Sequence, residues 1–149
     1  MIAVSRTKAK LEKATALGAA HALNAHEGRI AERVRELTHG HGADVVFELV
    51  ATKVTMAACT QALAKRGRLV FIGYSEDSFT VHPIQLVVTE ASVTGSVGNT
   101  LGELVRSVDL VARGTVRTVV DRVLPLAEFQ KGVDALARGE LVGRVVLKP

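Results

Sequence analysis

Short apolar runs alternate along the chain with segments in which apolar residues recur at helical spacing. Such runs of four to seven residues are typical of strands, and recurrence every three or four residues is typical of helices. The predicted strands are Ile2–Val4, Ala20–Leu23, Asp44–Val50, Leu69–Ile72 and Ser92–Gly95. The predicted helices are Lys8–Leu17, a segment through Ile30, Val34 and Leu37, Met56–Leu63 with Gly67 at its end, Pro83–Val88 and Leu101–Ala112.

The alternation of strand and helix predicts an α/β fold with a parallel sheet. The strand runs are apolar on both faces, as in parallel strands that helices cover on both sides. We therefore expect a doubly covered, Rossmann-like sheet.

The last part of the chain has its own strand, helix and strand pattern. Val119–Leu124 is a strand that Pro125 ends, Leu126–Ala137 is a helix, and Arg144–Leu147 is a final strand. This pattern predicts an appendage to another layer. We place a boundary near Thr115, which divides the chain into parts 1–115 and 116–149.

Composition and charge limit the classes of ligand and partner that the chain is expected to bind. The chain has 149 residues, a net charge of +4, 3% aromatic residues and no Trp, so stacking platforms for single-stranded nucleic acid are not expected. The charge describes either a solvated basic surface or attraction to a polyanion such as a dinucleotide phosphate. No apolar run has membrane-spanning length.

Cys59 is the single cysteine, which excludes an intramolecular disulfide and fits a reducing, cytoplasmic location. It lies in an apolar helical stretch, and we expect a buried small side chain in place of a nucleophile.

Several strings in order carry a family resemblance: IAVSRTKAKLEKATALGA, GADVVFELV, RGRLVFIGY, TGSVGNT and LPLAEFQKGVDALARGELVGRVVL. Together they resemble the zinc-type medium-chain alcohol dehydrogenases over essentially the whole chain. The resemblance implies a sheet that binds a nicotinamide cofactor along the carboxyl ends of its strands.

Under this resemblance, Ile2–Val4 is the second strand of a dinucleotide-binding domain, and the first strand with its glycine-rich G-x-G-x-x-G turn does not occur in the sequence. That strand would sit between Ile2–Val4 and Val45–Phe47. Three outcomes are open: the two strands close on each other, another chain fills the gap, or the chain is the C-terminal portion of a longer product. We favour the last.

The resemblance also implies cofactor-binding positions. They are Ser5, Arg6, Lys10, Leu49, Val50, Ile72, Gly73, Tyr74, Gly95, Ser96, Val97 and Arg144. NAD-using members carry an acid at the Ser5 position, which repels a 2′-phosphate. Ser5 followed by Arg6 favours NADP, with NAD as the alternative, because a guanidinium grips phosphate in a charge-assisted fork. In the competing interpretation, Arg6 faces solvent and Ser5 is a plain helix cap.

At the other positions the resemblance implies mostly backbone contacts. Leu49 and Val50 end a strand beside the adenosine ribose, where Ala51 stands in place of a frequent glycine. Ile72, Gly73 and Tyr74 end the next strand and face the nicotinamide, although Gly73 also suits a simple turn.

Two more positions carry polar contacts by resemblance. The backbone of Gly95–Val97 holds the carboxamide, and Arg144 reaches the pyrophosphate. Arg144 could equally be an exposed residue at the start of its strand.

The residues that would perform the chemistry are absent from the sequence. The family's zinc ligands and proton-relay residues lie in the preceding domain, so we assign no catalytic residue and no metal ligand here. His39 and His41 near Asp44 are too few for a tetrahedral zinc set. Glu48, inside an apolar strand, is expected to be a buried, hydrogen-bonded carboxylate.

The sequence thus predicts the C-terminal portion of an NAD(P)-dependent oxidoreductase that exchanges hydride with an alcohol or carbonyl substrate, inactive as an isolated chain. The alternatives are a non-catalytic nucleotide-binding or oligomerisation module and a zinc-free quinone reductase relative. We also expect a homo-oligomer, a dimer by resemblance, through the edge strand 92–95, and no nucleic-acid or membrane partner.

Overall fold

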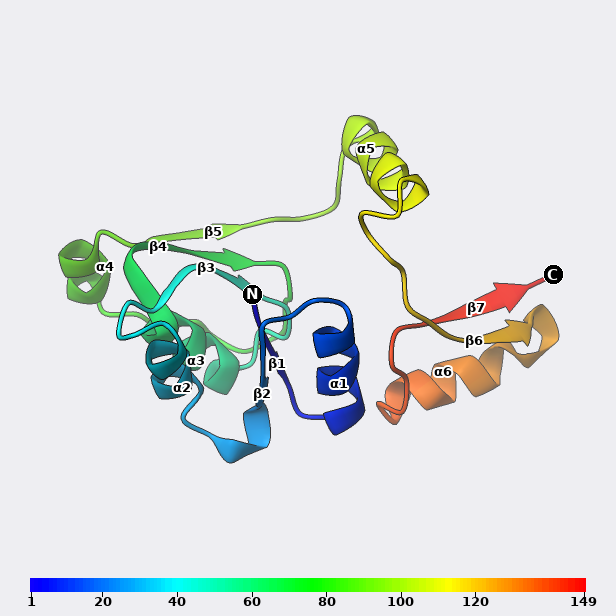
Figure 1. Cartoon of the computed structure of the whole chain (residues 1–149), viewed down its shortest axis with the longest axis horizontal. Helices are drawn as coiled ribbons and strands as arrows, with labels where there is room; N and C mark the ends of the chain where they lie inside the picture. Colours follow the sequence, from blue (N-terminus) through cyan, green and yellow to red (C-terminus); the bar gives the residue numbers. More distant parts are fainter. The chain divides into compact units, whose positions relative to one another are not determined.

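The computed structural model describes residues 1–149. Strands and helices alternate through most of the chain (Figure 1). The strands are β1 (Ile2–Ser5), β2 (His21–Asn24), β3 (Ala43–Glu48), β4 (Leu63–Phe71), β5 (Ser92–Gly95), β6 (Val120–Pro125) and β7 (Arg144–Lys148). The α-helices are α1 (Lys8–Ala16), α2 (Ile30–Leu37), α3 (Lys53–Ala62), α4 (Pro83–Thr89), α5 (Leu101–Ala112) and α6 (Phe129–Ala137). Short 3-10 helices lie at Ala25–Glu27 and Leu126–Glu128.

The strands form three sheets with the orders β1-β2, β3-β4-β5 and β6-β7. The pairs β3-β4, β4-β5 and β6-β7 are parallel. The α/β fold with parallel sheets, the edge position of β5 and the strand–helix–strand tail are therefore confirmed.

The chain divides into two compact units. One contains Met1, Ala3–Ala22 and Asn99–Pro149, and the other contains Ile2 and Leu23–Gly98. The predicted boundary near Thr115 is a different division and stays a prediction.

The core of the 23–98 unit gathers under β3 and β4. Leu23, Ala31, Val34 and Ala62 are buried together, and Leu69 in the middle of β4 is fully buried. Helices α2 and α3 pack on this side (Figure 1). On the opposite face of β3, Phe47 is 61% exposed. The second helical layer that the apolar pattern predicts is thus not supplied at β3 by this unit.

The sequence predicted Gly67 at the end of a helix, and this prediction is wrong. Gly67 lies inside β4. Helix α3 already ends at Ala62, and the β3-β4 register jumps from Leu63 opposite Ala43 to Arg68 opposite Val45. The skipped residues form a bulge. A Cβ at position 67 would lie 2.8 Å from the carbonyl oxygen of Ala64, so the bulge requires glycine.

No helix of the structure combines the length and the apolar character needed to cross a bilayer.

Candidate functional site at the carboxyl edge of the β3-β4-β5 sheet

Three parallel strands end at one edge of the 23–98 unit. Glu48 at the end of β3 lies opposite Phe71 at the end of β4, and Phe71 lies opposite Gly95 at the end of β5. The backbone N–H of Ser96 still donates to the Phe71 carbonyl at 2.9 Å. The loops that leave this edge carry eight of the twelve predicted site residues. Open α/β sheets bind their ligands at this kind of edge.

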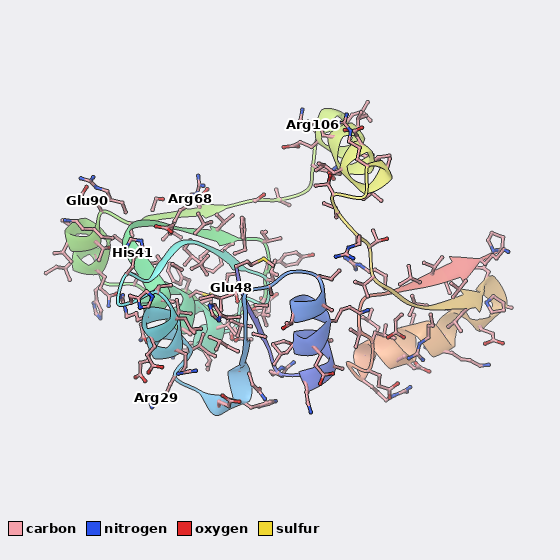
Figure 2. All side chains as sticks on the ribbon, viewed as in Figure 1. Arg29, His41, Glu48, Arg68, Glu90 and Arg106 are labelled. Atoms are coloured by element: carbon pink, nitrogen blue, oxygen red, sulfur yellow. The ribbon has the colours of Figure 1, made fainter.

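The chain turns immediately after Glu48, so Leu49 and Val50 lie beyond the strand and do not end it as expected. The buried Glu48 carboxylate, 2% exposed, accepts the N–H of Val50 at 2.9 Å and that of Ala51 at 2.5 Å. These bonds curl the backbone away from the ladder and leave Leu49 and Val50 65% and 56% exposed. The expected buried, hydrogen-bonded role of Glu48 is confirmed (Figure 2).

Ala51 occupies a conformation that suits glycine. Its φ is 59°, in the left-handed region that side chains with a Cβ avoid. The resemblance had marked this position as one where glycine is frequent, and the backbone angle supplies the physical reason. The two bonds from Glu48 help to hold the alanine there.

Gly73 is explained by the chain's own packing. Strand β4 ends at Phe71, so Ile72 and Gly73 also lie just past their strand, and both donate their N–H groups to the Glu48 carbonyl at 2.9 Å. A Cβ on Gly73 would lie 2.5 Å from the backbone nitrogen of Val50. The close approach that requires glycine is therefore to the loop after β3, and a simple turn does not account for it.

The remaining predicted residues of this edge are open. Tyr74 and Val97 are 92% and 96% exposed, and their N–H groups donate to no other group of the 23–98 unit. A Cβ on Gly95 would meet no atom within 4 Å. This edge therefore offers unpaired backbone donors with free space beside them.

Two residues that the sequence analysis missed join the loops. The Ser75 hydroxyl donates to the Ala51 carbonyl at 2.5 Å, and the Asp77 carboxylate accepts the N–H of Lys53 at 2.8 Å. Each bond spans 24 residues of sequence. No local pattern reports such a distant pairing.

Ser5, Arg6 and Lys10 belong to the other unit, where β1 leads into α1. The Ser5 hydroxyl accepts the N–H of Thr7 at 3.4 Å. Thr7, and not Ser5, is the N-cap of α1, so Ser5 is not a plain cap. Arg6 is exposed and Lys10 half-buried.

Arg144 begins β7 in the same unit as Arg6. Its N–H donates to the Val119 carbonyl at 2.9 Å. It is exposed and lines a hollow of about 220 Å³ between α6 and β7. Its side chain is thus accessible to a ligand.

A family model described as zinc-binding dehydrogenase matches residues 1–113. The match covers more than half of the chain. The chain belongs to the zinc-binding dehydrogenase family.

Known alcohol dehydrogenases match this chain along nearly its whole length. A NAD-dependent alcohol dehydrogenase of Sulfurisphaera tokodaii is 28% identical over 149 residues, which are 100% of this chain and 43% of the relative. An alcohol dehydrogenase of Geobacillus stearothermophilus is 28% identical over 99% of this chain and 43% of its own length. The crystal structure of the alcohol dehydrogenase of Aeropyrum pernix matches with a TM-score of 0.91 and 33% identity, covering 99% of this chain and 42% of that one.

This zinc-binding dehydrogenase chain therefore spans less than half the length of the relatives it matches, and it corresponds to their C-terminal, cofactor-binding portion. No group of three or more His, Cys, Asp or Glu side chains is placed to hold a metal ion. His41 instead contacts Asp44, with 2.8 Å between its Nε2 and the carboxylate.

Proposed function

We propose that the carboxyl edge of β3, β4 and β5 is one side of a nicotinamide dinucleotide site. The observation that carries the proposal is the coincidence of three parallel strand ends with unpaired N–H groups at Tyr74 and Val97 and free space at Gly95. Backbone donors and acceptors at such an edge suit a carboxamide, whose oxygen accepts and whose NH2 group donates hydrogen bonds.

The roles proposed for the site residues are those that the family resemblance implies. The backbone of Gly95, Ser96 and Val97 would hold the carboxamide, Ile72, Gly73 and Tyr74 would border the nicotinamide, and Leu49 and Val50 would lie beside the adenosine ribose. Arg144 would reach the pyrophosphate. When bound, the nicotinamide ring supplies hydride transfer, and these residues bind and orient it.

We propose that the whole protein exchanges hydride between NAD(P) and an alcohol or carbonyl compound. The names of the relatives support this reaction. Because no zinc ligand set is formed by its residues, we propose that the isolated chain does not oxidise alcohols. The same absence of a zinc ligand set also favours the alternative function, a non-catalytic nucleotide-binding module. Cofactor-dependent alcohol oxidation by the purified chain would contradict both statements about the chain alone.

We also propose NADP as the preferred cofactor. Ser5 carries no charge that would repel a 2′-phosphate, and the exposed Arg6 beside it can pair with one.

Titration of the purified chain with NADPH and NADH tests this preference. We expect tighter binding of NADPH, and we expect Ser5→Asp to reduce that preference by about tenfold, which corresponds to about 1.4 kcal/mol. Lys8→Ala, which removes an exposed lysine bonded to Glu12, is the matched control. Equal binding of both cofactors by the parent chain would count against the role of Arg6.

A further inference from the structure

We propose that Asp77 and Ser75 are positioning residues that lock the loop after β4 onto the loop after β3. The β3–α3 loop is residues 49–52 and the β4–α4 loop is residues 72–82. The lock makes two of the three strand ends of the candidate cofactor edge one rigid body. The link to cofactor binding rests on the proposed function, whereas the lock itself does not.

The lock consists of hydrogen bonds to two backbone groups of the short segment from Ala51 to Lys53. The Ser75 hydroxyl donates to the Ala51 carbonyl at 2.5 Å, and two residues later the Lys53 N–H donates to the Asp77 carboxylate at 2.8 Å. The N–H of Asp77 donates to the Ser75 hydroxyl at 3.0 Å. Ser75 and Asp77 are thus held to each other as well as to the β3–α3 segment.

Every backbone N–H from Val50 to Lys53 is held by a side chain. Glu48 accepts those of Val50 and Ala51, and Thr55 accepts that of Thr52 at 3.1 Å. Lys53 alone depends on the other loop. Loss of the Asp77 carboxylate would therefore leave the N–H of Lys53, at the start of α3, without its hydrogen-bond partner.

Two further features show that the segment is constrained. Ala51 has a φ of 59°, and such a conformation persists only where the surroundings over-determine it. Glu48 holds its N–H and Ser75 holds its carbonyl. Gly73 packs so closely on Val50 that a Cβ has no room, so the two loops meet without a gap.

The position of Asp77 suits a carboxylate. Lys53 is the first residue of α3, and a negative charge at a helix N-terminus is favoured by the helix dipole. The amide of an asparagine can accept the same hydrogen bond through its oxygen. Asp77→Asn should therefore keep the bond to Lys53, whereas Asp77→Ala should remove it.

The lock matters because it orders the binding edge before a ligand arrives. Leu49 and Val50 leave one of the joined loops, and Gly73 and Tyr74 belong to the other. A site that is already ordered loses less conformational freedom on binding, which raises affinity. Loss of the lock should weaken cofactor binding without removing any residue from the edge.

Amide hydrogen exchange of the full chain without cofactor tests the lock directly. We expect Asp77→Ala to speed exchange at Lys53 by about tenfold or more, and Asp77→Asn to stay within about threefold of the parent. Glu76→Ala is the matched control, because it removes the neighbouring exposed carboxylate, which makes no bond in the 23–98 unit. Parent-like protection in Asp77→Ala, or equal loss in Asp77→Asn, would overturn the lock.

The same variants titrated with NADPH and NADH test its consequence. We expect Asp77→Ala to raise the Kd about tenfold, with Asp77→Asn and Glu76→Ala near the parent. If Asp77→Ala does not fold, Ser75→Ala removes the other bond and replaces it in both experiments. A parent chain that binds neither cofactor refutes the proposed function and the positioning role together, while the exchange pattern still decides whether the lock exists.

Discussion

At the scale of single residues, Cys59 shows how burial sets chemistry. The thiol is half-buried on α3, and it is the chain's single cysteine. Burial, and after it the negative charge of Glu48, raises the pKa of Cys59 from 9.0 to about 11. The thiolate is the reactive form, so the raised pKa argues against a nucleophile, although the side chain is half-buried and not fully buried as expected.

We therefore expect slow alkylation of Cys59 in the folded chain. At pH 8 the folded thiolate fraction should be about 100-fold below that of the unfolded chain, since each pKa unit is a factor of ten. Mass spectrometry after iodoacetamide treatment, with and without urea, measures the ratio. Equal rates in the two states would contradict the assignment.

The raised pKa also predicts a pH dependence of stability. The folded state favours the neutral thiol, so the contribution of Cys59 is fully present below pH 9 and is lost as the pH rises from 9 towards about 11. Cys59→Ser, which keeps a small polar side chain but does not ionise in this range, should show a smaller loss over the same window.

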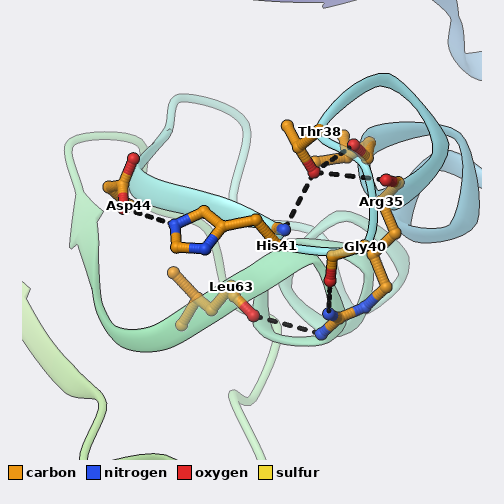
Figure 3. A network of polar contacts seen from close by, with 8 residues as sticks. Arg35, Thr38, Gly40, His41, Asp44 and Leu63 are labelled. Atoms are coloured by element: carbon orange, nitrogen blue, oxygen red, sulfur yellow. Dashed lines mark hydrogen bonds and ion pairs between the residues drawn. The ribbon is translucent and has the colours of Figure 1, made fainter.

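At the scale of elements, Arg35 joins α2 to the end of α3. Its guanidinium donates to the carbonyl oxygens of Leu63 at 3.1 Å and of Gly40 at 3.3 Å (Figure 3). It also donates to the Gln61 carbonyl at 3.1 Å. The carbonyls of Gln61 and Leu63 lie at and just beyond the C-terminus of α3, where a cation is favoured. A single side chain thus satisfies acceptors from two different segments.

Arg35→Ala should lower the free energy of unfolding by about 1–2 kcal/mol, because the charged hydrogen bonds are lost. Arg35→Lys should recover only part, since an ammonium lacks the planar fork of donors. Arg33→Ala is the control. Arg33 lies on the same helix and pairs with Glu36 at the surface, so its loss should cost about 0.5 kcal/mol or less. Urea denaturation measures all three, and similar losses for Arg33 and Arg35 would contradict this role.

At the scale of the whole molecule, the free edge of β5 bears on assembly. The Ser96 N–H donates to β4. The N–H groups of successive residues in a strand, such as Gly95 and Ser96, point to opposite edges, so the N–H of Gly95 points away from β4. We propose that the chain forms a homo-oligomer through this edge, as the family resemblance implies.

Gly95→Pro should reduce that association. Proline removes the outward N–H but leaves the pairing with β4 intact. Gly95→Ala is the control, because a Cβ there meets no atom within 4 Å and the N–H remains. Sedimentation velocity of the three chains measures the oligomeric state. A Gly95→Pro chain that associates as strongly as Gly95→Ala would refute an interface through β5.

Local pattern predicted the elements well, because it reports local causes. The predicted Leu101–Ala112 and Ser92–Gly95 match α5 and β5. The ends of β3 and β4 were predicted wrongly. Leu49, Val50 and Ile72 are apolar, so the runs continue through them, whereas the Glu48 carboxylate turns the chain earlier. A hydrophobic pattern does not predict where a strand ends when a side chain, here Glu48, accepts hydrogen bonds from the backbone N–H groups of the residues that follow it.

By itself, the sequence determined the α/β class, the order of strands and helices, and the family, since all of these depend on local periodicity and on strings read in order. Tertiary structure alone decided which loops touch. The grip of Ser75 and Asp77 on Ala51 and Lys53, and the contact that requires glycine at position 73, join residues about 24 positions apart. The physical reason is that backbone groups left unpaired at the ends of parallel strands are satisfied by whichever neighbour the sheet brings beside them, and that neighbour is set by the fold.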